Sequence, residues 1–338
     1  MKKFYWSAPR RSVCPIIPIF LPFRGCPARC VYCAQHTQTG QGPMPFQDIL
    51  DKAGTVLRAR ALAGLPPPEL AFYGGTFTSM PEKEQRQCLD LADSALQRGL
   101  ICSFRCSTRP DSVDIPALTR LRDAGCSTVE LGVQSFTDAA LTAARRGYDG
   151  AAAAAACNLV KQAGLNLGVQ LLPGMPGVSP EVFICDVSAA LRMGADMLRF
   201  YPCLVLAGTE LAREWRAGGY RPWDMEVCLA SLAQGCLMAM AHKTPVIRMG
   251  LAPEAALDGE VLAGPVHPAL GERVMARALL MAVLQEADGG RLFALDAPLR
   301  CQGYFWGHRG ELRAAWAALG LGSDEVRFVE GEEVRLYL

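Results

Sequence analysis

The sequence Phe23-Arg24-Gly25-Cys26-Pro27-Ala28-Arg29-Cys30-Val31-Tyr32-Cys33 contains three cysteines in the spacing C-x3-C-x2-C. It follows the apolar run of residues 15–21, Pro-Ile-Ile-Pro-Ile-Phe-Leu, which predicts a short buried strand. That strand would carry three thiolates in the loop at its end. Thiolates are soft ligands that select iron–sulfur clusters, zinc or copper(I). The loop therefore predicts a small metal centre.

The number of cysteines in this loop helps to separate the candidate metal centres. A structural zinc site takes four protein ligands, usually as two pairs. The sequence contains no second C-x2-C pair and no H-x3-H pair. Three cysteines without a fourth suit a [4Fe–4S] cluster in which one iron is open to another ligand. Cys26, Cys30 and Cys33 are therefore the predicted ligands of a single cluster.

Composition narrows the class of protein. The 338 residues are 51% hydrophobic and 20% charged, which is enough apolar sequence for one large α/β core. No run of eighteen uncharged apolar residues occurs, and the basic start of the chain lacks the apolar region of a signal peptide. The scattered spacing of the 14 cysteines argues against a disulfide framework. We therefore expect a cytoplasmic protein without membrane association.

Short apolar segments alternate with helical patterns over residues 16–202. Such alternation predicts βαβ units and a parallel sheet. Six units favour a partial (β/α)6 barrel, while a doubly wound sheet remains open, and in both folds the active site lies at the C-terminal ends of the strands. Strands are expected over 16–21, 69–73, 101–107, 128–133, 167–172 and 197–202. Helices are expected over 46–63, 81–98, 115–124, 138–163 with a break at 147–150, and 180–193.

Beyond residue 202 the alternation weakens. A helix over 224–241 is expected to pack on the barrel, and residues 245–250 predict a further strand. A helix over 270–286 and short strands and a helix over 291–338 predict a small α/β appendage. We therefore divide the chain into a core of residues 14–245 and a C-terminal appendage of residues 246–338.

Polar and glycine motifs follow several of these strands. Gly74-Gly75-Thr76 closes the second strand, where two glycines would let the backbone approach a ligand or simply form a tight turn. Ser107-Thr108-Arg109-Pro110-Asp111 ends the third strand, and Glu130-Leu131-Gly132-Val133-Gln134-Ser135 ends the fourth. Because parallel strands end at one edge, we expect these motifs to meet.

The cysteine loop, with Tyr32 directly before its last cysteine, resembles the signature of the radical S-adenosylmethionine (SAM) superfamily. The resemblance implies a partial TIM-like barrel and a [4Fe–4S] cluster whose open iron is chelated by SAM. The reduced cluster would then give one electron to the sulfonium, and the 5′-deoxyadenosyl radical released would abstract hydrogen from a substrate. Gly74, Gly75 and Thr76 are similar to the glycine motif that contacts the SAM amino group in that family.

A closer resemblance is to the elongator catalytic subunit family, the tRNA uridine carboxymethylating branch. It rests on Gly-Gly-Thr-Phe at residues 74–77, on the two strand-end motifs above, and on four later segments over residues 16–241. The first cysteine spacing is narrower here than in that family, and no counterpart of its acetyltransferase domain is expected after residue 241. The later segments are Arg146-Gly147-Tyr148, Leu172-Pro173-Gly174-Met175-Pro176-Gly177, Tyr201-Pro202 and Gly208-Thr209-Glu210-Leu211.

Side-chain chemistry suggests roles for individual residues at the strand ends. Tyr32 offers an aromatic face to adenine or packs in the core. Arg109 would bind the SAM carboxylate with two prongs or pair with Asp111. Tyr201 would contact the substrate, relay a radical or form a wall. Gln134, Ser135 and Gln170 would either form hydrogen bonds with the ribose or close the mouth of the barrel by bonding loop backbone groups. Thr108 completes the expected cofactor site.

The net charge of the chain limits which binding partners are expected. The net charge of +1 excludes a strong overall electrostatic attraction to nucleic acid, so RNA binding would depend on local basic patches. One candidate patch consists of Lys2, Lys3, Arg10 and Arg11, and the alternative is that these residues form a solvated tail. The family resemblance implies a reductant such as flavodoxin or ferredoxin and a tRNA or other RNA substrate. Two alternatives stay open: a small-molecule oxidoreductase of the coproporphyrinogen-dehydrogenase type, and a non-catalytic iron–sulfur protein.

Overall fold

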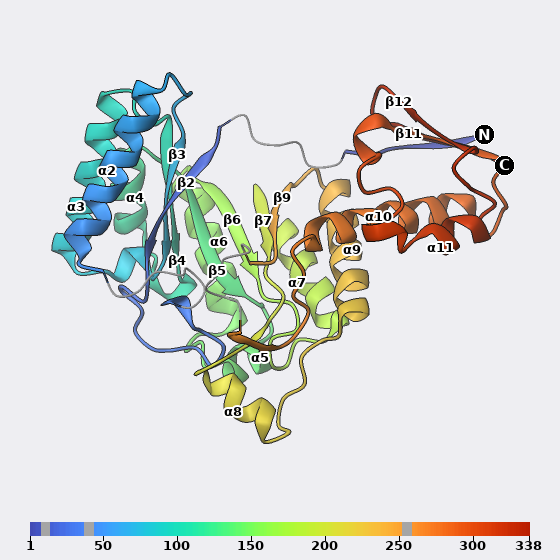
Figure 1. Ribbon diagram of the computed structural model, residues 1–338. Helices are drawn as coiled ribbons and strands as arrows, with labels where there is room; N and C mark the ends of the chain where they lie inside the picture. Colours follow the sequence, from blue (N-terminus) through green and yellow to red (C-terminus); the bar gives the residue numbers. More distant parts are fainter. Residues whose placement is uncertain (8–13, 37–43, 252–258) are drawn as a thin grey trace.

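The computed structural model describes residues 1–7, 14–36, 44–251 and 259–338 (Figure 1). Arg10 and Arg11, which were expected to form part of a basic patch, lie outside these residues. No helix in the described ranges combines the length and the apolar character needed to cross a membrane.

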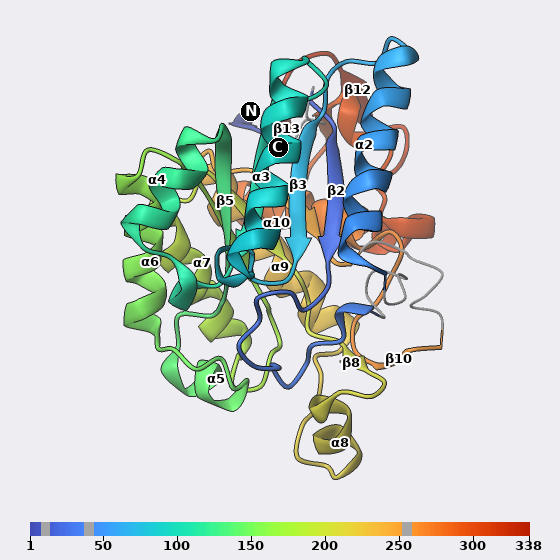
Figure 2. The same ribbon diagram turned by 90° about the vertical axis from the view of Figure 1, so that its left-hand side faces the viewer.

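A curled sheet of seven strands forms the centre of the molecule, and every neighbouring pair in it is parallel. The sheet has open edges at its first and last strands, so it is a partial barrel, as predicted (Figures 1 and 2). In spatial order the strands are β2 (Ile16–Leu21), β3 (Glu69–Gly74), β4 (Ser103–Thr108), β5 (Cys126–Gln134), β6 (Asn166–Leu171), β7 (Met197–Phe200) and β9 (Val246–Met249).

The expected count of six strands is one too few. β9 pairs with β7 in parallel register and extends the sheet beyond the sixth βα unit. The sequence predicts this strand, but the alternation has broken down before it, and its partner could not be read from the pattern. The chain from residue 246 to 249 thus lies in the barrel sheet, adjacent to the proposed domain boundary.

Helices cover the outer face of the sheet (Figure 2). They bury one apolar stripe each; α2, for example, buries Ile49, Ala53 and Leu57 at helical spacing. The break predicted within residues 138–163 separates α5 from α6, and the Asp149 carboxylate caps α6 by accepting a hydrogen bond from the Ala152 amide. The helices are α2 (Phe46–Leu62), α3 (Glu82–Gln97), α4 (Ile115–Asp123), α5 (Asp138–Ala143), α6 (Gly150–Gln162), α7 (Pro180–Arg192) and α9 (Met225–Ala241).

A second sheet joins the two ends of the chain, with strand order β1-β13-β11-β12. β1 (Lys2–Tyr5) pairs antiparallel with β13 (Glu333–Tyr337), so both termini lie together (Figure 1). The ammonium of Lys3 pairs with Glu333 at 3.0 Å. The basic N-terminus is therefore an edge strand, not a solvated tail. The other elements here are β11 (Ala294–Pro298), β12 (Val326–Val329), α10 (Leu270–Ala287) and α11 (Arg313–Ala318).

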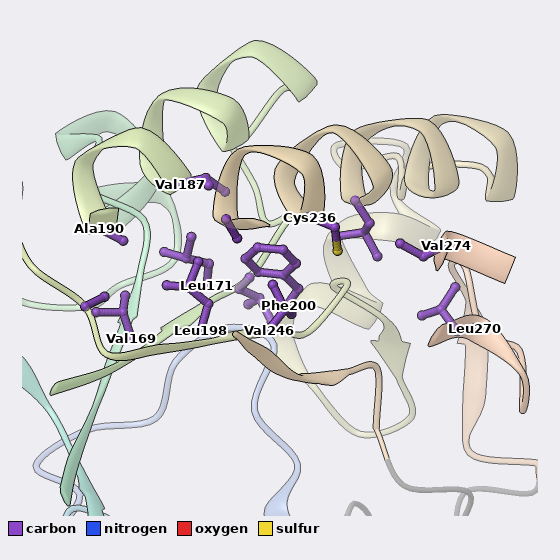
Figure 3. Close-up of a cluster of buried hydrophobic side chains, with 14 of the residues drawn as sticks. Val169, Leu171, Val187, Ala190, Leu198, Phe200, Cys236, Val246, Leu270 and Val274 are labelled. Atoms are coloured by element: carbon purple, nitrogen blue, oxygen red, sulfur yellow. The ribbon is translucent and has the colours of Figure 1, made fainter. Parts of the chain in front are cut away.

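One continuous hydrophobic core spans both sheets. Figure 3 shows Phe200 of β7 packed among side chains from the barrel sheet, from α7 and α9, and from α10. The Phe200 ring meets the Phe183 ring edge to face, with 5.1 Å between the centroids. Because α10 contributes Leu270 and Val274 to the same cluster, the C-terminal unit is fastened to the barrel through α9 and α10.

A short two-stranded ribbon lies beside the C-terminal ends of the barrel strands. It consists of β8 (Val205–Leu206) and β10 (Val261–Ala263), which pair antiparallel, and α8 (Glu210–Arg216) follows β8 along the chain (Figure 2). Leu204 and Leu206 from this segment line the cavity described next.

Candidate active site

A cavity of about 540 Å³ opens at the C-terminal ends of the barrel strands. This volume lies within the range of about 300–1,000 Å³ that is typical of small-molecule sites. All three cysteines of the loop line it, as do nine of the ten residues expected to bind the cofactor. Those nine are Tyr32, Gly74, Gly75, Thr76, Thr108, Arg109, Gln134, Gln170 and Tyr201.

Ser135 is the expected site residue that does not line the cavity. Its side chain is fully buried, and its hydroxyl donates a hydrogen bond to Asp186 at 2.7 Å while accepting one from the Thr137 amide. Asp186 also accepts from the Phe136 amide at 2.8 Å. Ser135 therefore fastens the β5–α5 turn to α7, which matches the alternative role of satisfying loop groups.

The cysteine loop and the end of β3 interlock through glycines. A Cβ atom at Gly75 would lie 2.0 Å from the carbonyl oxygen of Arg24, and one at Gly25 would lie 2.3 Å from the carbonyl oxygen of Thr76. The Thr76 amide donates a hydrogen bond to the Arg24 carbonyl at 2.7 Å. The sequence left open whether this glycine pair approaches a ligand or forms a tight turn, and in the structure Gly75 packs closely against the cysteine loop.

Thr76 and Gly74 complete this junction. The Thr76 hydroxyl is buried and lies 3.4 Å from the sulfur of Cys26. Gly74 has a positive φ of 105°, and a Cβ there would lie 3.2 Å from the backbone of Leu21 at the end of β2. The end of β3 therefore fixes where the loop leaves β2 and where Cys26 points.

The three thiols line the same cavity, and two guanidinium groups lie beside the Cys30 sulfur. Burial, together with the neighbouring Cys30 and Cys26, raises the pKa of the Cys33 thiol to about 12. The Nη1 atom of Arg146 lies 3.0 Å from the Cys30 sulfur, and Nη1 of Arg109 lies 3.8 Å from it. Two guanidinium groups therefore lie beside one sulfur of the loop, and the thiolate is the form of cysteine that binds metal.

Arg146 is the residue that sequence reasoning undervalued. Its motif resembles a family segment but suggests no role for the side chain, yet Arg146 is 5% exposed and holds several groups of the site. Nη1 also approaches the Tyr32 hydroxyl at 3.3 Å, Nη2 donates to the Gly132 carbonyl at 2.5 Å, and Nε donates to Tyr148 at 2.9 Å. It thereby joins the cysteine loop to the end of β5.

Arg109 adopts the second of its two expected roles. Its Nε and Nη2 atoms form a two-pronged ion pair with Asp111 at 2.9 and 2.7 Å, and Nη2 also donates to the Arg146 carbonyl. Because Asp111 occupies this fork, the geometry favours the structural ion pair over direct capture of a ligand carboxylate.

A buried ionic network forms the inner wall of the cavity around Glu130, which is fully buried. One of its carboxylate oxygens accepts hydrogen bonds from Arg199, Arg105 and Tyr73 at 2.9, 3.0 and 2.8 Å, and the other accepts from Gln170 at 2.9 Å. Burial alone would raise the pKa of Glu130, but Arg199, with Gln170 and Arg105, lowers it overall. The barrel interior therefore holds a compensated charge cluster.

Gln170 and Tyr201 belong to the edge of this network. Gln170 also reaches the Ser107 hydroxyl at 3.2 Å, and the Tyr201 hydroxyl accepts from Arg199 at 3.2 Å. Gln134 has a positive φ of 69° and lies where the β5–β6 register shifts. Such backbone at the edge of a cavity is common at functional sites.

Arg248 on β9 provides a further cationic group at the cavity. It is the register partner of Arg199 on β7. Its Nε donates to the Gly250 carbonyl at 3.1 Å, and its two terminal amino groups contact no carboxylate among the described residues. Arg199 and Arg248 were missed, although a charged residue within an apolar strand signals an inward-facing polar site.

The donor set fits an iron–sulfur cluster. Three free thiols, two of them half-buried, border one cavity beside guanidinium groups. Cys26, Cys30 and Cys33 would hold the cluster. The adjacent cavity, with backbone groups at residues 74–76 and polar side chains at the strand ends, would take a ligand of the size of SAM.

Comparison with known proteins identifies two family segments. The radical SAM superfamily matches residues 20–184, and the radical SAM C-terminal domain matches residues 195–280. The first segment begins just before the cysteine loop and ends within α7, and the second includes β9 and part of α10. The matches therefore cover β3 to β7 and β9 in full, together with the end of β2.

Individual relatives agree with this assignment. A tRNA uridine(34) acetyltransferase from Methanocaldococcus infernus is 27% identical over 274 residues, which are 69% of this chain and 51% of that protein. The heme chaperone HemW of Mycobacterium tuberculosis is 28% identical over 214 residues, which are 62% of this chain and 54% of that protein. The chain thus spans about half the length of the curated relatives it matches.

A solved structure shows the same fold. The archaeal Elp3 of Methanocaldococcus infernus, lacking residues 1–46 of its own sequence, has a TM-score of 0.60 at 21% identity, over 82% of this chain and 64% of that one. The partial TIM-like barrel is thereby confirmed, as is the resemblance to the elongator catalytic subunit. The two family segments and the cysteine-lined cavity show that the chain belongs to the radical SAM superfamily of enzymes, whose cofactors are a [4Fe–4S] cluster and S-adenosylmethionine.

Proposed function

We propose that the chain is a radical SAM enzyme that acts on RNA, with tRNA as the substrate. Cys26, Cys30 and Cys33 would hold one [4Fe–4S] cluster, and SAM would bind beside it against residues 74–76. When bound, these cofactors supply radical chemistry that abstracts a hydrogen atom from the substrate. The observation that carries the proposal is that all three thiols open into the same cavity as the interlocked glycines and strand ends.

The chain's own residues place and protect the cofactors. Arg146 contacts the Cys30 sulfur and ties the cysteine loop to β5. The half-buried ring of Tyr32 lines the cavity next to Cys33 and limits the access of water. The Glu130 network keeps the inner wall fixed and close to neutral, so that a bound ligand meets a rigid surface.

Two observations support an RNA substrate over a small molecule. Relatives named as tRNA uridine(34) acetyltransferases match up to 69% of this chain. The terminal amino groups of Arg248, which lines the cavity, remain available for an anionic group such as a phosphate. The match to a heme chaperone supports the alternative of a small-molecule oxidoreductase that acts on a tetrapyrrole. This alternative would lead if the protein failed to bind RNA.

The cell supplies the remaining partners in this proposal. A low-potential reductant such as flavodoxin or ferredoxin would donate the electron. The scattered spacing of the cysteines along the sequence supports action in a reducing cytoplasm.

The first experiment tests the radical SAM chemistry. Anaerobically reconstituted protein should contain about four irons per chain, and after reduction it should convert SAM to 5′-deoxyadenosine. Cys30→Ser should lose both properties. Cys185→Ser changes an exposed thiol on α7 and should keep both. Full iron content and SAM cleavage in Cys30→Ser would refute the proposed site.

The second experiment tests the substrate. The protein should bind tRNA at low salt, with a modest dependence of affinity on salt because few cations are available. Arg248→Gln should weaken this binding, whereas Arg98→Gln, at the exposed end of α3, should not. Absence of salt-dependent tRNA binding would overturn the RNA assignment alone and leave the radical SAM chemistry standing.

A further inference from the structure

Two cysteines outside the active site lie in unusually close contact. The sulfur atoms of Cys14 and Cys102 are 2.8 Å apart, well within the van der Waals separation of two sulfurs. Cys102 is exposed and Cys14 is half-buried. Free cysteines are commonly buried as small hydrophobic residues, and the exposed Cys102 departs from this pattern.

The backbone around the two cysteines is held by the start of the barrel sheet. Cys14 precedes β2, Cys102 precedes β4, and β3 lies between these strands. The Glu69 amide donates to the Pro15 carbonyl, and the Cys102 amide donates to the Pro68 carbonyl, both at 2.9 Å. The approach of the two sulfurs is therefore built into the register of three adjacent strands.

The other contact between thiols outside the cysteine loop lies in the interior of the described structure, because Cys106 contacts Cys126 and both side chains are buried. Cys88, Cys157 and Cys236 are buried residues of α3, α6 and α9, so an oxidant in solution would not reach them. Cys185 is exposed on α7, but no other sulfur is in contact with it among the described residues. The pair at residues 14 and 102 is thus a close pair of sulfurs that solvent reaches, at the end of the barrel opposite the cavity.

We propose that Cys14 and Cys102 form a reversible intrachain disulfide by exchange with a low-molecular-weight disulfide such as oxidised glutathione. The Cys102 thiolate attacks one sulfur of oxidised glutathione, which breaks the glutathione S–S bond and releases one glutathione. Cys14 then attacks the Cys102 sulfur and displaces the second glutathione. Overall, two protein thiols are oxidised to one disulfide, and oxidised glutathione is reduced to two glutathione molecules, which take up both protons.

The order of attack follows from the surroundings of the two sulfurs. Burial, together with the contact with Cys102, raises the pKa of the Cys14 thiol to about 11. Cys14 is therefore the poorer first nucleophile, and it is placed to resolve a mixed disulfide on its neighbour. Exposed Cys102 is the group that an external disulfide meets first.

The disulfide would lock an edge strand. Among the described strands, β2 pairs with β3 alone, and its far end leads into the cysteine loop. A bond between residues 14 and 102 ties the start of β2 to β4 across β3. Because it also closes a long loop of chain, it restricts the unfolded state. Oxidised protein should therefore keep β2 in the sheet and unfold at a higher temperature than reduced protein.

Peptide mapping tests the proposal on the full chain. After anaerobic treatment with oxidised glutathione and alkylation, trypsin should release residues 12–24 linked to residues 99–105, and dithiothreitol should separate them. Residues 162–192 contain Cys185 alone and should carry glutathione instead, as an internal control. Cys102→Ser should abolish the linked peptide and the increase in the unfolding temperature.

Two results would overturn the inference. In one, residues 12–24 and 99–105 each carry glutathione or remain free thiols under conditions that modify Cys185. In the other, either peptide is linked to a cysteine of the loop at residues 26–33. Neither readout requires the loaded cluster or SAM cleavage, so the outcome is independent of the proposed function.

Discussion

Replacing Gly75 with alanine tests the interlock that places the cysteine loop. The backbone of Gly75 is not in the left-handed region, so its conformation would accept alanine. Only the surroundings forbid it, because the new Cβ would lie 2.0 Å from the Arg24 carbonyl oxygen and 2.8 Å from the Arg24 amide. Both atoms are backbone and cannot move aside as a side chain would.

The size of the effect follows from these distances. Cβ atoms essentially never approach such an atom within 3.0 Å, so the loop must move by about 1 Å away from β3. This displacement weakens the hydrogen bond from the Thr76 amide to Arg24, now 2.7 Å long. Overpacking costs about 1–3 kcal/mol, and the lost hydrogen bond adds roughly 1 kcal/mol. A movement of about 1 Å also exceeds the tolerance of about 0.5 Å for a functional site, and Cys26 is only two residues from Arg24.

The assay measures iron per chain after anaerobic reconstitution, together with the thermal midpoint of the protein. Gly75→Ala should lose most of its iron and unfold at a lower temperature. Gly271→Ala is the matched control, because Gly271 lies in α10, where an added Cβ would meet no atom within 4 Å, and this variant should keep its iron. If Gly75→Ala retained full iron and an unchanged midpoint, the glycine would be a simple turn residue and the interlock would not position the cluster ligands.

Two further predictions concern buried carboxylates. Glu130→Gln leaves buried Arg199 without its carboxylate partner and leaves buried Arg105 with Glu69 alone. This change should reduce the free energy of unfolding by about 3–5 kcal/mol in denaturant titrations, against less than about 0.5 kcal/mol for half-exposed Glu214→Gln. Equal effects of the two substitutions would contradict the network. Burial raises the pKa of Asp186 to about 6, although hydrogen bonds from Phe136 and Ser135 act in the opposite direction. The folded state therefore binds the proton more tightly than the unfolded state, and the stability that this group contributes is lost as the pH rises from about 4 to 6. Asp186→Asn should therefore gain roughly 2–3 kcal/mol relative to the parent protein between pH 4 and pH 7, and a difference independent of pH would count against this account.

Local patterns in the sequence predicted the elements and the place of the site. The alternation of apolar strands and amphipathic helices specifies parallel βα units, because each period reports which face is buried. Parallel strands end at one edge, so the cysteine loop and the motifs near residues 74, 109 and 134 were expected to meet there. The cavity confirms that nine of ten expected residues line one space.

Contacts between distant segments could not be read in this way. The pairing of β1 with β13 joins residues that are separated by more than 300 positions, and nothing in Lys2–Tyr5 names its partner. The same holds for β9 beside β7 and for the sulfurs of Cys14 and Cys102. Hydrophobic period identifies a strand but not its neighbour, because strand pairing depends on how the whole chain closes.

The sequence by itself determined the chemistry of the loop, the parallel fold and the edge at which the site lies, because thiol spacing and apolar period are local properties. Tertiary structure alone decided what the individual polar groups do there. In the folded protein Gly75 packs against Arg24, and Arg109 forms an ion pair with Asp111. Arg248 lines the cavity, and its terminal amino groups contact no carboxylate among the described residues. The physical reason is that a charge or a glycine has no fixed partner until folding brings distant backbone and side chains within a few ångströms.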